Sequence, residues 1–339
     1  MILIDSLYIN MGGGKVLLDY LCSRMIERGM EFTLLKDERC GVLHCDNNMK
    51  NVIMMKAGLK ERKFFYKKHR EEFSAVLCFG NVPPPIKMPC RVHTYFHNIN
   101  LLSIPSEFPL MRKMRNWLKQ RYITSLAKNT DTWIVQTKNT EACLRKVLPC
   151  NNKQVLQLPF YYIPEELKAQ ANNITGRKDY ILVGNYTGTR GHDELLGAFY
   201  LLKDKGITPT LHLTVSDDNS FSKEIDHAIS EGVQIQNHGI VPYSELVEIY
   251  GQCKATIYPS INESLGLGII EAIEAGCDVI ASDLPFTHSI CRPSEMLAQR
   301  TLKDIANAVI RYERGVSPKS QLLIHDCVEE LIDMLKSEK

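Results

Sequence analysis

The chain has 339 residues, of which 44% are hydrophobic and 24% charged, values that exclude a disordered or collagen-like protein. Its length suffices for about two domains that each bury their own core. No apolar run approaches the roughly 18 residues of a membrane span. The N-terminal residues 1–5 lack the features of a secretory signal, so we expect a cytoplasmic protein.

The two halves of the chain carry opposite charge. Residues 1–165 contain 25 Lys and Arg against 14 Asp and Glu, a net charge of +11, and the remaining residues sum to −9. This asymmetry indicates that the first half faces an anionic partner. The 11 cysteines include no CxxC pair, which predicts reduced thiols and neither a disulfide framework nor a zinc site.

Strand-like and helix-like segments alternate along both halves. Predicted strands of the first half are residues 2–4, 32–35, 75–79, 92–96 and 133–135, with helices over 109–127 and 138–147. Predicted strands of the second half are residues 180–183, 211–215, 233–235, 255–258 and 278–281, with a helix over 192–205. This alternation predicts an α/β fold with two doubly wound parallel sheets, each covered by helices on both faces.

A break in the pattern marks the domain boundary. Pro159 and Pro164 are followed by a polar, Gly-ended stretch at 172–176, which is typical of a linker. We therefore assign residues 1–165 to an N-terminal Rossmann-like domain and 166–318 to a C-terminal one. Residues 319–339 form a predicted C-terminal helix that we expect to pack back toward the N-terminal domain. Two such domains predict a ligand cleft between them, at the carboxyl ends of their strands.

The most informative segment is 258–276, which reads YPSINESLGLGIIEAIEAG. A predicted strand ends there, a loop carries Glu263, and a short helix starts at about Gly266 and carries Glu271. Glycines let the backbone approach a ligand closely, and free amides at a helix start favour a phosphate. Two carboxylates beside an anion site suit a nucleotide-sugar, one for the ribose hydroxyls and one for the sugar.

This segment resembles the Glu-x7-Glu signature of the retaining glycosyltransferases of family 4, which have the GT-B fold of two Rossmann-like domains. Both glutamates have the required separation, and residues 276–283 match the family's continuation. An ordinary helix that carries acids by chance is the alternative interpretation of the spacing alone. The resemblance implies that Glu271 binds the ribose and Glu263 orients the sugar. It also implies that a loop holds the diphosphate through the backbone of Ser264, Leu265, Gly266, Leu267 and Gly268.

Residues 183–192, VGNYTGTRGH, resemble the family's Gly-Arg-x4-Lys-Gly turn, whose two cations hold the donor diphosphate. Gly184 opens the turn, and Arg190 takes the lysine position, where its guanidinium can bind phosphate oxygens bidentately. Asn185 takes the arginine position, so one expected cation is missing. The segment with Val241 resembles the one whose backbone reads the nucleotide base.

The first half carries two further candidate site segments. Gly13 and Gly14 belong to a Gly-Gly-Gly-Lys turn that has neither Walker nor GxGxxG spacing, so it is either a tight turn or a close approach to donor or acceptor. His97 follows the predicted strand 92–96 and matches the family's His-Asp histidine, with Asn98 in the Asp place. The resemblance places His97 near the transferred sugar.

Two basic stretches, 56–70 and 111–121, interleave Lys and Arg with aromatic and Met residues. Basic residues beside exposed aromatics suit an anionic membrane surface, and a solvated basic helix face is the alternative. No nucleic-acid-binding motif accompanies the charge, so no nucleic acid is expected. The family's lipid-diphosphate-linked acceptors favour a peripheral protein at the inner face of the cell membrane.

The resemblance implies transfer of a hexose-type sugar, with retention, from a UDP- or GDP-sugar to a hydroxyl of a glycan or lipid-diphosphate-linked acceptor in surface polysaccharide biosynthesis. The N-terminal domain would hold the acceptor and the C-terminal domain the donor. The sequence lacks a DxD-type metal motif, so no metal or other cofactor is expected. A sugar-nucleotide epimerase on the same fold and a non-catalytic GT-B binding subunit remain as alternatives.

Overall fold

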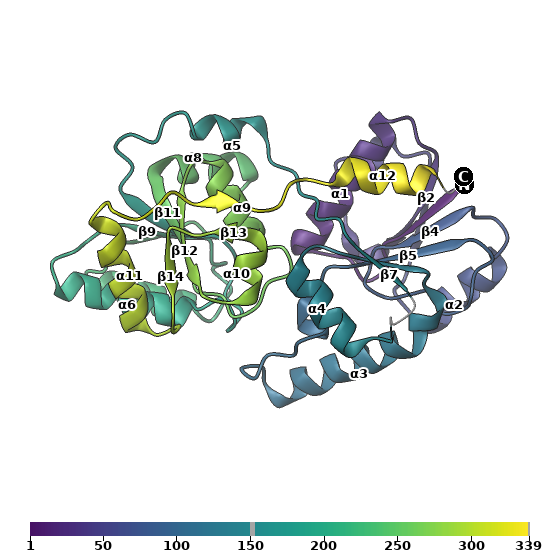
Figure 1. Ribbon diagram of the computed structural model, residues 1–339, viewed down its shortest axis with the longest axis horizontal. Coiled ribbons are helices and arrows are strands. Elements are labelled where there is room, and N and C mark those ends of the chain that lie inside the picture. Colours follow the sequence, from purple (N-terminus) through teal and green to yellow (C-terminus); the bar gives the residue numbers. More distant parts are fainter. Residues whose placement is uncertain (150–152, 338–339) are drawn as a thin grey trace. The chain divides into compact units, whose positions relative to one another are not determined.

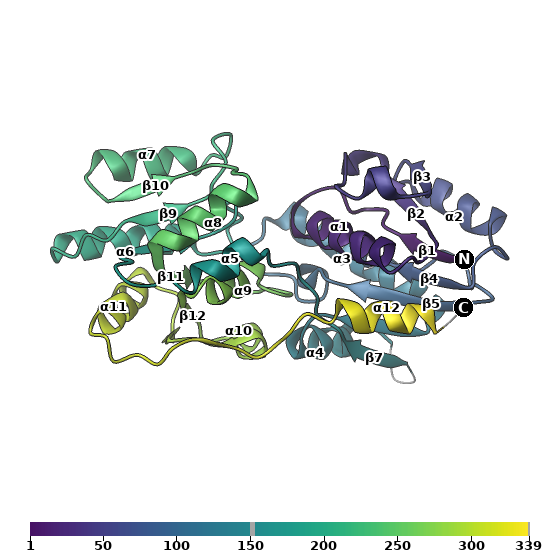
Figure 2. The ribbon, with the colours of Figure 1, turned by 90° about the horizontal axis from the view of Figure 1, so that it is seen from above.

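The computed structural model describes residues 1–149 and 153–337, and the chain divides into two compact units (Figures 1 and 2). The first unit comprises Met1–Tyr162 and His325–Lys339, and the second comprises Ile163–Ile324. These boundaries lie a few residues from the expected limits after 165 and 318. Residues 150–152 and 338–339 of the expected domains lie outside the described part of the chain.

Within the described residues, the first unit is built on a seven-stranded parallel sheet. Its strands are β1 (Ile2–Asp5), β2 (Phe32–Asp37), β3 (Asn51–Met55), β4 (Ala75–Cys78), β5 (Arg91–Phe96), β6 (Thr132–Val135) and β7 (Gln154–Gln157). The order is β3-β2-β1-β4-β5-β6-β7, so the direction of winding reverses between β1 and β4. Such a reversal is where doubly wound sheets bind ligands, at the carboxyl ends of the strands.

Helices and short 3-10 turns connect the strands of this unit. The helices are α1 (Gly12–Glu27), α2 (Leu59–Lys68), α3 (Leu110–Leu126), α4 (Lys138–Val147) and α12 (Val328–Lys336). The 3-10 turns are Glu38–Cys40, Asp46–Asn48, Ile99–Leu101 and Ala127–Asn129. Among the described residues, no helix combines the length and the apolar character needed to cross a membrane.

The second unit repeats the plan with a six-stranded parallel sheet among the described residues. Its strands are β8 (Asp179–Leu182), β9 (Leu211–Leu213), β10 (Ile235–Asn237), β11 (Cys253–Tyr258), β12 (Asp278–Ser282) and β14 (Glu295–Leu297). The order β10-β9-β8-β11-β12-β14 reverses between β8 and β11. A short antiparallel pair joins β13 (Cys291–Arg292) to β15 (Gln321–Leu322).

Seven helices cover this second sheet in the described chain. They are α5 (Glu165–Gln170), α6 (His192–Asp204), α7 (Ser222–Ser230), α8 (Tyr243–Gln252), α9 (Leu267–Glu274), α10 (Pro285–Ile290) and α11 (Leu302–Glu313). The prediction of two doubly wound parallel sheets is therefore confirmed.

The expected C-terminal helix is shorter than predicted, because β15 and an irregular segment precede α12. That helix lies beside α1 in both ribbon views (Figures 1 and 2). Arg24 contacts Glu329 at 2.6 Å, and Arg28 contacts Glu329 at 3.0 Å and Asp333 at 2.8 Å. The phenol of Tyr20 donates a 2.6 Å hydrogen bond to Asp326.

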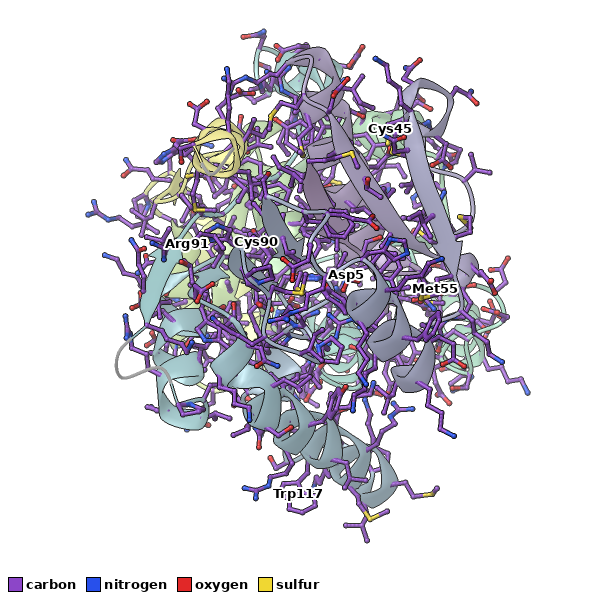
Figure 3. All side chains as sticks on the ribbon, turned by 90° about the vertical axis from the view of Figure 1, so that its right-hand side faces the viewer. Asp5, Cys45, Met55, Cys90, Arg91 and Trp117 are labelled. Carbon is purple, nitrogen blue, oxygen red and sulfur yellow. The ribbon has the colours of Figure 1, made fainter. Side chains whose placement is uncertain are left out.

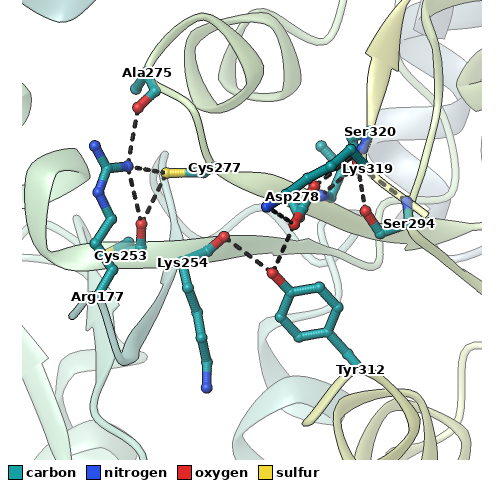
Figure 4. Close-up of polar contacts among 11 residues, drawn as sticks. Arg177, Cys253, Lys254, Ala275, Cys277, Asp278, Ser294, Tyr312, Lys319 and Ser320 are labelled. Carbon is teal, nitrogen blue, oxygen red and sulfur yellow. Dashed lines mark hydrogen bonds and ion pairs between the residues drawn. The ribbon is translucent and has the colours of Figure 1, made fainter. Parts of the chain in front are cut away.

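A polar cluster closes the amino ends of β11 and β12 (Figure 4). The carboxylate of Asp278, the first residue of β12, accepts bonds of 2.8 Å from Tyr312, 2.8 Å from Lys319 and 3.0 Å from the Ser320 amide. Although burial raises it, these donors lower the pKa of Asp278 overall. Arg177 donates nearby to the Ala275 carbonyl at 2.9 Å. Loops follow the strands at the opposite, carboxyl edge of the sheet.

A buried ion pair anchors the first unit. Arg62 of α2 contacts Asp5, the last residue of β1, at 2.8 Å, and it donates to the carbonyls of Val82 and Pro83 at 2.8 Å each. Tyr66 donates a 2.7 Å bond to the same carboxylate. Although burial lowers it, the Asp5 carboxylate raises the pKa of Arg62 above its usual range.

The expectation that the basic stretch 56–70 is exposed is wrong in part. Arg62, Phe65 and Tyr66 were expected on the surface, but all three are buried, because one face of α2 packs on the sheet. Phe64 remains exposed on the opposite face. Phe64, the lysines around it, Leu59 and Arg70 are the residues of this stretch that remain exposed beside Glu61.

Breaking the pair should destabilise the first unit. We expect Arg62→Met to lower the free energy of unfolding by about 3–5 kcal/mol, because the Asp5 carboxylate is left buried and uncompensated. Both tryptophans lie in this unit, so their fluorescence during guanidinium unfolding measures the loss. Lys63→Met, on the exposed face of the same helix, should stay within about 0.5 kcal/mol of wild type. Equal stability of the two variants would contradict the assignment.

Candidate functional site

Two loops meet where the winding of the second sheet reverses. One follows β8 and ends at Gly191, and the other follows β11 and begins at Pro259. A Cβ atom on Gly191 would lie 2.7 Å from the Pro259 carbonyl oxygen, and the Ile261 amide donates a 3.0 Å bond to the Thr189 carbonyl. Segments about seventy residues apart in the sequence therefore form one surface at the predicted binding edge.

Arg190 is positioned by a glycine. Its Nη1 donates a 2.9 Å bond to the Val183 carbonyl, and a Cβ atom on Gly184 would lie only 1.5 Å from that nitrogen. Gly184 has a φ of +116°, which side chains rarely adopt, and its amide donates to Thr214 Oγ1 at 2.7 Å. The guanidinium thus lies across the backbone of the turn, and any other residue at 184 would displace it.

Glu263 lies beside this guanidinium. Its Oε1 is 3.8 Å from Arg190 Nε and accepts bonds of 3.2 Å from the Tyr258 hydroxyl and 3.0 Å from Ser260 Oγ. The three contacts hold one carboxylate oxygen. The carboxylate group is 17% exposed as a side chain, so a ligand in the loop can reach it. Glu263 is therefore oriented before any ligand binds.

Glu271 is the fifth of the eight residues of α9 and is buried. Burial raises the pKa of its carboxyl to about 7, although hydrogen bonds from Tyr250 and Tyr243 and the charge of Arg190 oppose the shift. The Tyr250 hydroxyl donates to Glu271 Oε2 at 3.1 Å. Both tyrosines belong to α8, so the helix that follows Val241 positions this carboxylate.

The start of α9 is shaped by glycines. Gly266 caps the helix in the left-handed conformation at φ +66°, and a Cβ on it would lie 3.0 Å from Ile290. A Cβ on Gly268 would lie 3.2 Å from the Tyr258 ring. Ser264 and Leu265 complete the loop, and Leu267 is the first helical residue. Free amides at such a helix start form an anion site.

The charges of this cluster act on one another. The pKa of Arg190 is raised, most by the Tyr258 phenol and less by the carboxylates of Glu263 and Glu271, whereas burial opposes the shift. The structure therefore brings together Arg190, Gly184, both glutamates and the glycine-rich loop, which the sequence places in two separate motifs. A fixed cation, helix amides and two carboxylates can bind a diphosphate with hydroxyls on either side of it.

Asn185 has a structural role at the position of the missing cation. Its Oδ1 accepts bonds from the amides of Tyr186 at 3.0 Å and Ser216 at 3.3 Å, and from Asn219 Nδ2 at 3.0 Å. These bonds join the loop after β8 to the segment after β9. The Asn185 side chain therefore fixes the conformation of the loop and supplies no positive charge. Of the two cations expected in this turn, Arg190 is present and the other position is occupied by Asn185.

Sequence reasoning missed His192, the first residue of α6. Its Nε2 lies 3.1 Å from the Gly184 carbonyl, and its buried Nδ1 has no hydrogen-bond partner among the described residues. Burial lowers the pKa of this imidazole to about 4, so it is neutral at pH 7. The signal in the sequence that could have identified His192 is its position directly after Gly191, at the start of the helix. His192 supports the same turn that Arg190 crosses.

Val241 lies between β10 and α8, and it is partly exposed. Just before it, His238 Nε2 contacts His212 Nδ1 at 2.9 Å, and His212 Nε2 contacts Asp179 Oδ2 at 3.3 Å. The rings of the two histidines are stacked at 5.2 Å. This chain of contacts from β8 through β9 holds the segment that was expected to read the base.

The first-unit candidates gather at the carboxyl ends of β1, β4 and β5. A Cβ on Gly14 would lie 3.0 Å from His97 Cε1, whereas Gly13 has open space around it. His97 Nε2 lies 3.0 Å from the Phe79 carbonyl, and its amide donates to Asn81 Oδ1 at 2.8 Å. Burial lowers the pKa of His97 to about 4. Gly14 therefore permits the close approach of a neutral, fixed imidazole.

The helix α3 carries an apolar row on its exposed face. The exposed apolar residues are Leu110, Met111, Met114, Trp117 and Leu118. Figure 3 shows Trp117 on the outer side of α3, whereas Asp5 lies in the interior. The basic side chains Arg115, Lys119 and Arg121 are exposed on the same helix. This combination is typical of a surface that meets a lipid headgroup layer.

Comparisons with known proteins point to the class of protein that the sequence motifs predict. Residues 164–320 match the family described as "Glycosyl transferases group 1". The serotype-specific mannosyltransferase WbdA of Escherichia coli is 25% identical over 172 residues, 48% of this chain and 21% of that protein. O-antigen chain mannosyltransferase B of Escherichia coli is 22% identical over 271 residues, 73% of this chain and 70% of that protein.

The fold is similarly shared. The crystal structure of Anabaena Alr3699/HepE in complex with UDP and glucose matches with a TM-score of 0.67 at 12% identity, covering 99% of this chain and 96% of that one. The chain thus has the GT-B fold class and resembles the group 1 glycosyltransferases, as its motifs predicted. It spans about a fifth of the length of the WbdA relative.

The raised pKa of Glu271 should make the stability of the protein depend on pH. Below its usual pKa of 4.5 the carboxyl is protonated in both folded and unfolded chains. As pH rises from about 4.5 to about 7, the carboxyl ionises in the unfolded chain but stays protonated in the folded one, so stability is lost across this range and not further above it. At about 1.4 kcal/mol per pKa unit, the loss is about 3 kcal/mol. Glu271→Gln should escape it and gain stability relative to wild type as pH rises.

Melting temperatures of both proteins from about pH 4.5 to 8 measure this difference. Glu274→Gln, on the same helix but partly exposed, should follow the wild-type curve. Parallel curves for Glu271→Gln and wild type would contradict a buried carboxyl with a raised pKa.

Proposed function

We propose that this chain is a glycosyltransferase that moves a sugar from a nucleoside-diphosphate sugar to an acceptor hydroxyl in surface polysaccharide biosynthesis. One observation carries the proposal: Arg190, Glu263 and Glu271 come together at the strand-order reversal of the unit that matches the group 1 family. The printed names of the relatives, mannosyltransferases of O-antigen and serotype synthesis, support the substrate class. The UDP in the HepE structure supports a nucleotide donor.

The donor would be a UDP- or GDP-sugar bound to the second unit. Glu271 accepts two ribose hydroxyls, and the amides at the start of α9 together with Arg190 hold the diphosphate. Glu263, held by Tyr258 and Ser260, orients the sugar hydroxyls. Val241 and its neighbours contact the base. From the first unit, the neutral His97 hydrogen-bonds the sugar, and Gly13 and Gly14 allow close approach of donor or acceptor.

The reaction follows the retaining course proposed for this resemblance. The bond between the anomeric carbon and the diphosphate oxygen breaks, and the acceptor oxygen bonds to that carbon on the same face. The acceptor proton passes to the departing diphosphate oxygen, so charge and atoms balance. Arg190 and the helix amides stabilise the charge that develops on this diphosphate, which requires no metal in the proposed step.

The carboxylates provide the direct test. Charge-assisted hydrogen bonds contribute about 1.5–3 kcal/mol, so Glu271→Ala should weaken binding of UDP or GDP roughly tenfold to a hundredfold. Glu263→Ala should keep much of that affinity and lose turnover by on the order of a hundredfold, because the sugar is no longer oriented. Transfer is measured with UDP-glucose, UDP-N-acetylglucosamine and GDP-mannose, and nucleotide binding by calorimetry.

Glu274→Ala is the matched control, since Glu274 lies on the same helix three residues beyond Glu271. It should be milder than either variant. If it were the most damaging while Glu263→Ala and Glu271→Ala kept full activity and affinity, the glycosyltransferase assignment would be wrong. Nucleotide binding with no transfer or donor cleavage in wild type would instead favour a non-catalytic binding subunit, an alternative that the Asn185 substitution favours.

We further propose that α3 docks on an anionic membrane surface, where a lipid-diphosphate-linked acceptor would be found. The exposed apolar row of α3 enters the headgroup layer, and its cations contact the lipid phosphates. The exposed lysines of α2 add charge to the same unit. The proposal therefore rests mainly on residues 111–121 and less on 56–70 than the sequence indicated.

Charge reversal on α3 should weaken this docking. Each cation at the surface contributes about 1 kcal/mol, so Arg115→Glu with Lys119→Glu should reduce binding to vesicles of mixed neutral and anionic phospholipid at least tenfold. Salt should weaken wild-type binding as well. The control, Lys223→Glu with Lys303→Glu, makes the same charge change at exposed sites of the second unit. Equal cosedimentation of both variants, or equal binding to neutral vesicles, would refute the docking surface.

A further inference from the structure

Three potential metal ligands gather where the chain returns to the first unit. His325 is the first residue of the returning segment, Cys327 follows two residues later, and Glu330 lies in the first turn of α12. One nitrogen, one sulfur and one carboxylate oxygen from these side chains all lie within 4.8 Å of one another. None of the three belongs to the proposed donor site, which lies in the second unit.

Two of the three separations are close to those of ligands around one ion, and the third lies within 4.8 Å. His325 Nε2 lies 3.4 Å from Cys327 Sγ and 3.7 Å from Glu330 Oε1. Ligands at the usual Zn–N and Zn–O distances of about 2.0 Å and Zn–S of about 2.3 Å stand roughly 3.3–3.5 Å apart in a tetrahedron. Small rotations of the two exposed side chains would therefore close the set on a single ion.

The backbone around these ligands is already held in place. The Cys327 amide donates a 2.8 Å bond to the Pro159 carbonyl. Asp326 accepts from the Tyr20 hydroxyl at 2.6 Å and from the amides of Tyr161 and Val328 at 3.3 Å and 3.1 Å. Ordering of the ligands thus costs little conformational entropy beyond the side chains themselves.

Access and chemistry both favour a borderline-soft ion. Cys327 is 5% exposed and forms the floor, whereas His325 and Glu330 are exposed and form an open rim. Imidazole, thiolate and carboxylate together suit Zn²⁺, whereas Mg²⁺ and Ca²⁺ prefer oxygen ligands. Three protein ligands leave the fourth tetrahedral position for a water molecule.

We propose that His325, Cys327 and Glu330 form a zinc site that orders the returning C-terminal segment at the start of α12. On binding, the thiol gives up its proton to solvent and the sulfur bonds to the ion. The lack of a CxxC pair predicts no zinc site, whereas the proposed ligands are three different residue types within six positions. The site is independent of the proposed transfer reaction, and its test needs no activity.

The test uses the full chain, freed of any affinity tag, treated with EDTA and then separated from the chelator. Titration with Co²⁺ should give one tight equivalent, with visible bands of tetrahedral cobalt and a near-ultraviolet thiolate-to-cobalt band, and Zn²⁺ should displace it. Cys327→Ser should abolish the thiolate band and weaken binding at least about tenfold. Cys143→Ser, which removes a partly exposed thiol on α4, should change neither.

A second variant guards against misfolding of Cys327→Ser. His325 is exposed, so His325→Ala should fold as wild type does, and zinc should raise the melting temperature of wild type but not of this variant. Absence of a stoichiometric thiolate–cobalt band in wild type would overturn the proposal, leaving the three side chains as a hydrogen-bonded cluster. So would an equal band in Cys327→Ser.

Discussion

The candidate site depends on one close approach, that of the Arg190 guanidinium to the backbone of Gly184. Because residue 184 has no Cβ, the arginine can lie across its own turn, donate to the Val183 carbonyl and still face Glu263. The loops after β8 and β11 then meet through Gly191 and Pro259, and α9 begins beneath them. Each of these contacts needs the strand-order reversal, which sends neighbouring crossovers to opposite faces and leaves the edge open.

The buried carboxylates of the two sheets differ in how fully their charge is compensated. Asp5 with Arg62 in the first unit, and Asp278 with Tyr312 and Lys319 in the second, are paired and hydrogen-bonded within the framework. Glu271 is buried with fewer compensating partners, and its carboxyl has a raised pKa. A carboxylate that is costly to ionise when buried gains from a ligand that donates hydroxyl hydrogens to it, and such perturbed pKa values cluster at functional sites.

The first unit offers surfaces of a different kind. Its edge carries a neutral His97 packed against Gly14, while α3 presents exposed apolar and basic side chains together. Its C-terminal segment, joined to α1 by Arg24 and Arg28, contains the proposed zinc ligands. The proposed sugar transfer, membrane docking and zinc binding thus use separate parts of the chain.

The sequence by itself determined the class of fold, the buried central strands and the two motifs of the second unit, because apolar runs and glycine spacing are local properties. The sequence did not predict the edge strands β3 and β7, since their apolar runs are short and partly exposed. Only the tertiary structure decided that Arg62, Phe65 and Tyr66 face the core, because the side of α2 that packs depends on the Asp5 carboxylate fifty-seven residues away. It alone also placed Tyr250 on Glu271 and Arg190 beside Glu263, contacts between distant segments that spacing along one chain does not encode.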